Sequence, residues 1–125
     1  MIPMPGSILV FAAAAVATSA LAMAACDDAR KQECDALLST MKPLDVGTPS
    51  SASVDAVSKA VGGLKFQNQP LGVYATNYQK TLAVLSATVK LKEGGSAPDG
   101  TDAVIKENLA HARTDRDDVQ RFCSK

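Results

Sequence analysis

The chain has no tryptophan, and its aromatic residues are limited to three phenylalanines and two tyrosines. A hydrophobic core must therefore be built mainly from Leu, Val, Ile and Ala side chains. Thirteen basic residues balance thirteen acidic ones, so the chain carries no net charge. Because binding to the phosphates of nucleic acid requires a basic face, we expect no nucleic-acid partner.

Motifs for catalysis or cofactor binding are also scarce. The single histidine, His111, has no second ligand at the spacing of a zinc site, and a position at the solvent edge is the simpler interpretation. Glu93, Asp99 and Asp102 surround a Gly-rich loop, but they lack the alternating spacing and the closing glutamate of a calcium loop. We therefore expect no enzyme activity, no metal and no cofactor, with a thiol-based redox protein as the alternative.

The first 26 residues contain no charged side chain. Within them, residues 8–25 form a run of apolar and small residues, which is typical of the hydrophobic region of a signal peptide. The residues before this run include no Lys or Arg, where signal peptides usually carry positive charge. The pattern predicts a cleaved signal peptide over residues 1–25 and an exported protein. The alternative is a retained membrane helix, for which about 18 residues is short.

The leader ends in Met23-Ala24-Ala25-Cys26. Small residues before a cysteine resemble the lipobox of bacterial lipoproteins, in which the cysteine thiol receives a diacylglyceryl group before cleavage. Met23 departs from the Leu that is usual three residues before the cysteine, whereas the other positions fit. The resemblance implies lipidation of Cys26 and attachment to a membrane through that lipid. Ordinary cleavage after Ala24, with Ala22 as the other small residue, is the alternative.

Three cysteines are present, at positions 26, 34 and 123. An odd number in an exported protein leaves one thiol unexplained. If Cys26 carries lipid, Cys34 and Cys123 can form a disulfide with no thiol left over. The alternatives are a bridge from Cys26 to Cys34 or to Cys123, with one free thiol.

Four segments after the leader show helical periodicity. Apolar residues recur at intervals of three and four over residues 27–41, 54–64, 71–92 and 101–123. The third segment is the clearest, because six apolar positions follow a heptad spacing over nearly three repeats. These positions are Leu71, Ala75, Tyr78, Leu82, Leu85 and Val89.

Turn and cap residues set the expected helix ends. Pro43 should end the first helix, and residues 44–50 should form a linker. Ser51 or Ser53 is expected to cap the second helix, and Asp99 or Thr101 the fourth. Residues 67–70 predict a break before the third helix.

Four amphipathic helices with short connections predict an all-α fold. We expect a single antiparallel up-down bundle over residues 26–125, with three helices as the alternative to four. Four antiparallel helices would return the chain to the end where it began and bring Cys123 close to the first helix. A Cys34–Cys123 bridge would then stabilise the small core by about 4 to 5 kcal/mol in the chain-entropy model.

These patterns predict a class of protein rather than a specific activity. The chain is similar to small helical bacterial lipoproteins, which carry a cysteine near each end of the domain. We expect a non-enzymatic protein of the bacterial cell envelope, lipid-anchored, periplasmic or extracellular, that acts as an interaction or structural module with an envelope or extracellular protein partner. The alternative is a periplasmic or secreted carrier of a small apolar ligand, for which Ala75 and Ala112 could leave space.

Overall fold

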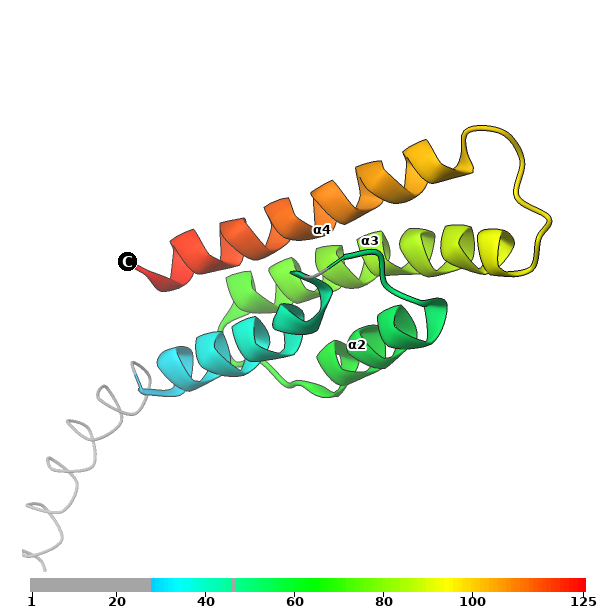
Figure 1. Ribbon diagram of the computed structural model, residues 1–125. Helices are drawn as coiled ribbons and strands as arrows, with labels where there is room; N and C mark the ends of the chain where they lie inside the picture. The colour runs from blue at the N-terminus through cyan, green and yellow to red at the C-terminus, as the bar shows by residue number, and fades with distance from the viewer. Residues whose placement is uncertain (1–27, 46) are drawn as a thin grey trace, which may run out of the picture.

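A computed structural model describes residues 28–45 and 47–125, and this part of the chain is helical without any strand. The first helix covers residues 28–41. It is followed by a 3-10 helix, η1 (Lys42–Asp45), and by the α-helices α2 (Ser51–Gly63), α3 (Gln69–Glu93) and α4 (Thr101–Cys123). Each α-helix runs opposite to the one before it, which confirms the expected up-down bundle of four helices (Figure 1).

The expected signal peptide and the expected lipidation residue, Cys26, lie outside the described residues. Among those that are described, no helix combines the length and the hydropathy needed to cross a membrane.

The helices differ in length, and this sets how they share the bundle. α3 and α4, with 25 and 23 residues, form a long antiparallel pair. The first helix is joined to the end of α4, and α2 lies along the second half of α3 (Figure 1). The two shorter helices therefore cover different parts of the long pair.

One continuous core lies between the helices. All six heptad positions expected on α3 are buried, and Leu82 and Leu85 have no exposed surface. Tyr78 is the largest of the fully buried side chains. The remaining core is aliphatic apart from the sulfur-containing Cys34 and Met41.

The prediction of a linker over residues 44–50 is wrong at its start, because residues 44 and 45 belong to η1 (Lys42–Asp45). Pro43 is accommodated because a residue in the first turn of a helix needs no intrahelical partner for its N–H. Leu44 is only 3% exposed and joins the core. Burial of this side chain holds η1 against the bundle.

Two helix caps differ from expectation. Ser50, rather than Ser51 or Ser53, caps α2 by accepting a hydrogen bond from the backbone N–H of Ser53 at 3.2 Å. α4 has no side-chain cap at all, because Gly100 precedes it with a φ of +90°, a conformation that favours glycine. Thr101 is the first residue of α4, and its hydroxyl donates to the Pro98 carbonyl at 2.6 Å.

α3 begins earlier than the break at residues 67–70 predicts. Asn68 caps it by accepting a hydrogen bond from the backbone N–H of Leu71 at 3.1 Å. Pro70 then lies in the first turn, where proline is favoured because its fixed φ suits the helix and its missing N–H costs nothing.

A polar contact joins α2 to the second half of α3. Asp55 on α2 accepts a hydrogen bond from the buried Ser86 hydroxyl at 2.5 Å and forms an ion pair with Lys90 at 3.0 Å. The hydrogen bond from Ser86 and the contact with Lys90 hold the pKa of Asp55 below its usual value of 3.8. The folded protein therefore favours the charged carboxylate.

Core packing on α3 can be tested with two substitutions on the same helix. Leu82→Ala should lower the free energy of unfolding by about 2 to 5 kcal/mol, because it leaves a cavity in a tightly packed interior. Val84→Ala is the matched control: Val84 is 50% exposed, and its loss should change that free energy by no more than about 0.5 kcal/mol. Urea denaturation measures both values, and equal effects would contradict the assigned faces of α3.

The Asp55 contact should make stability depend on acid pH. A carboxyl whose pKa is lowered by folding contributes stability at neutral pH, and the contribution disappears as the pH falls through the folded-state pKa. Asp55→Asn should therefore melt at a lower temperature than wild type at pH 7. The difference should close as the pH falls below about 4. Thermal melts followed by circular dichroism at several pH values measure this, and a gap that stays constant down to pH 2 or so would contradict it.

Candidate functional site at the disulfide end of the bundle

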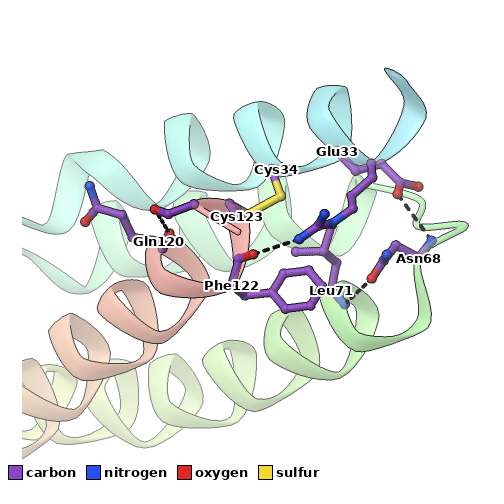
Figure 2. The surroundings of a disulfide bond; sticks show 9 residues. Glu33, Cys34, Asn68, Leu71, Gln120, Phe122 and Cys123 are labelled. Carbon is purple, nitrogen blue, oxygen red and sulfur yellow. Dashed lines mark hydrogen bonds between the residues drawn. A yellow bond between two sulfur atoms is a disulfide. The ribbon is translucent and has the colours of Figure 1, made fainter. Parts of the chain in front are cut away.

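The most elaborate group of contacts lies where the first helix meets the end of α4. Cys34 and Cys123 form a disulfide there, 89 residues apart in sequence, with their Cα atoms 5.9 Å apart (Figure 2). This separation lies in the usual range for disulfides. The structure thus contains the Cys34–Cys123 bridge that an antiparallel bundle of four helices predicts.

Arg30, one turn before Cys34, contacts the residue next to the other cysteine. Its guanidinium donates a hydrogen bond to the backbone carbonyl of Phe122 at 2.8 Å. The same guanidinium lies over the Phe122 ring, with Cζ 4.7 Å from the ring centroid, in a cation–π contact. Arg30 therefore binds both the main chain and the side chain of Phe122.

The Phe122 ring also contacts α3. It lies 5.6 Å from the Tyr74 ring, measured between centroids, at an interplanar angle of 52°. Tilted pairs at this distance are favourable because the edge of one ring meets the face of the other. Three helices therefore meet at Phe122, directly beside the disulfide.

Glu33 connects the same helix to the loop between α2 and α3. Its carboxylate accepts a hydrogen bond from the backbone N–H of Gln67. It also accepts one from the backbone N–H of Asn68 at 3.2 Å (Figure 2). Asn68 in turn caps α3. The start of α3 is therefore held by a carboxylate that neighbours Cys34.

A depression of about 590 Å³ opens over the disulfide. Both cysteines line it; Cys34 is 4% exposed, and Cys123 is half-buried. Its other lining residues come from the first helix and from the end of the chain. They are Arg30, Lys31, Asp35, Leu38, Gln120, Ser124 and Lys125. Three cationic side chains and one carboxylate side chain therefore surround the disulfide.

A second depression, of about 380 Å³, lies between the first helix and the α2–α3 loop. Its apolar lining comes from Leu64 and Phe66 on the loop and from two alanines of the first helix. Ala75 and Ala112, the small residues that could leave space between the helices, are buried in the core at 4% and 3% exposure.

The remaining candidate residues of the sequence do not come together. His111 is exposed on α4. Glu93 accepts hydrogen bonds from the backbone N–H and the hydroxyl of Ser51, and Asp102 forms an ion pair with Lys92 at 2.7 Å. Within the described ranges, no three His, Cys, Asp or Glu side chains gather closely enough to hold a metal ion.

Arg30, Glu33 and Phe122 were not singled out by the sequence. Each lies within four residues of Cys34 or Cys123, so the expected disulfide itself is the signal that could have found them. Residues one turn from a bridged cysteine must lie near the partner helix. Which of them make contact depends on the rotation of each helix, which the sequence pattern does not fix.

Comparison with protein-family models, with curated proteins and with solved structures finds no match to this chain. Its residues and their contacts are therefore the basis for a functional proposal.

A double-mutant cycle can measure the cation–π contact separately from the adjacent hydrogen bond. Phe122→Leu removes the ring but keeps the backbone carbonyl that Arg30 binds, so the hydrogen bond cancels in the cycle. Arg30→Ala and Phe122→Leu should show a coupling free energy of about 0.5 to 1 kcal/mol in denaturant unfolding. Strictly additive effects would show that the guanidinium does not interact with the ring.

Proposed function

We propose that this chain is an exported helical protein of the bacterial cell envelope that acts as an interaction or structural module. The Cys34–Cys123 disulfide is the observation that supports this proposal. Disulfides persist in oxidising compartments and are rare in the cytosol, where thiols are kept reduced. The apolar, uncharged leader over residues 1–25 agrees with export.

Lipid on Cys26 would anchor the protein to a membrane. Two of the three cysteines are joined to each other, which leaves Cys26 as the third, at the position where the lipobox resemblance expects lipidation. Two or more acyl chains give firm anchoring, whereas one chain alone holds only marginally. The described first helix starts at residue 28, so the bundle would lie directly at the membrane surface.

Several carboxylates that could otherwise take part in chemistry are engaged in structural contacts. Glu33 binds backbone N–H groups, Asp55 binds Ser86 and Lys90, and Glu93 binds Ser51. These carboxylates join neighbouring elements of the bundle. We therefore propose action through contact with an envelope or extracellular protein rather than catalysis.

The apolar depression beside Leu64 and Phe66 favours a second candidate function, the carriage of a small apolar ligand. Native mass spectrometry of protein purified from its own host tests it. A bound small molecule that is lost in Phe66→Lys would support carriage. Protein of the bare polypeptide mass, together with no binding of a fluorescent fatty acid, would count against it.

Intact mass spectrometry of the full chain expressed in a bacterium tests export and anchoring together. The expected product starts at Cys26, carries a diacylglyceryl group and an acyl chain, and gains two hydrogens on reduction of the disulfide. Cys26→Ala should lose the lipid mass and leave the membrane fraction, because neither Cys34 nor Cys123 follows the small residues of a lipobox. A reduced, unprocessed chain of 125 residues in the cytosol would overturn the proposal.

A further inference from the structure

We propose that the Cys34–Cys123 disulfide is a reducible clasp. Its reduction releases the first helix, residues 28–41, from the bundle, while α2, α3 and α4 stay packed on one another. The proposal concerns the described bundle alone, so it holds whether or not Cys26 carries lipid.

The first helix contributes little to the core. It buries three side chains, those of Cys34, Leu37 and Met41, and one of these is a clasp residue. α2 also buries three side chains, whereas α3 buries seven and α4 buries five. Burial of apolar surface is the main stabilising term, and only the first helix has one of its few buried side chains in the disulfide itself, so its hold on the bundle depends most on that bond.

The other three helices have polar contacts among themselves that do not involve the first helix. Ser86 and Lys90 of α3 bind Asp55 of α2. On its other side, α3 contacts α4 where the Thr81 hydroxyl donates to the Asp115 carboxylate at 2.9 Å. These contacts and the shared core remain when the first helix leaves.

Without the clasp, the described part of the first helix is joined to the rest only through η1 and the chain that follows it. Its polar contacts with the bundle are those of Arg30 and Glu33, which are partly open to water and therefore weak. The helix has 14 described residues, a length that is marginal for an isolated helix in water. Once released it should therefore unfold rather than persist as a separate helix.

The depression over the disulfide gives a reductant access to the bond. Cys123 is the more exposed of the two residues, and we take its sulfur as the atom that an incoming thiolate attacks. The basic side chains of Arg30, Lys31 and Lys125 line the approach and attract the negative charge of a thiolate.

The reductant is a dithiol, either a small molecule or a protein. Its thiolate bonds to the Cys123 sulfur, the disulfide breaks, and the electron pair leaves on the Cys34 sulfur, which takes up a proton. The second thiol of the reductant then displaces Cys123 from the mixed disulfide, and Cys123 is protonated in turn. The two cysteines are reduced, and the dithiol is oxidised to an intramolecular disulfide.

Hydrogen exchange followed by mass spectrometry on the full chain tests the release. On addition of dithiothreitol, amides of residues 28–41 should exchange at least about tenfold faster, while those of 75–89 and 105–119 keep their protection. Cys34→Ser combined with Cys123→Ser is the matched control, and it should show the released pattern without reductant and no response to it. Continued protection of residues 28–41 after reduction would overturn the proposal, and so would loss of protection in all helices together.

The rate of reduction tests the role of the basic side chains separately. Lys31→Gln with Lys125→Gln should slow reduction by dithiothreitol about two- to tenfold at low ionic strength, and the difference should shrink in high salt. Lys59→Gln on α2 is the control, because this residue does not line the depression, and it should leave the rate unchanged. Equal rates of reduction for wild type, the double variant and Lys59→Gln would overturn the proposed role of these cations.

Discussion

The covalent bond between Cys34 and Cys123 is the constraint on which the arrangement at one end of the bundle depends. It fixes the first helix against the end of α4, and this position brings Arg30 to the carbonyl and the ring of Phe122. The same position lets Glu33 reach the two backbone N–H groups that precede α3. A single bond therefore sets the geometry of contacts among three helices and a loop.

α3 supports the rest of the bundle. Its inward face supplies the largest share of buried side chains, and its two flanks bind α2 through Ser86 and α4 through Thr81. Its outward face carries Val73, Val84 and Leu91 at 47 to 57% exposure, beside the exposed Lys80.

The sequence predicts the four helices well, because apolar residues recur at helical intervals in each. It also predicts the buried face of α3, because the heptad repeat identifies which residues of that helix are apolar and lie on one side. It also predicts the disulfide, since four antiparallel helices place Cys34 and Cys123 at the same end. Cap residues are predicted poorly: Ser50, Ser51 and Ser53 are equivalent in type, and their roles depend on where α2 meets Glu93. Lipidation of Cys26 stays a prediction.

Four helices of alternating direction also place the start of the described chain and its last residue, Lys125, at one end, with the α3–α4 turn at the opposite end (Figure 1). This turn, residues 94–100, is exposed throughout. In an anchored protein, a tag fused to the last residue would be crowded between the bundle and the lipid surface. An epitope inserted in the turn would instead project into the surrounding compartment, where an antibody could reach it.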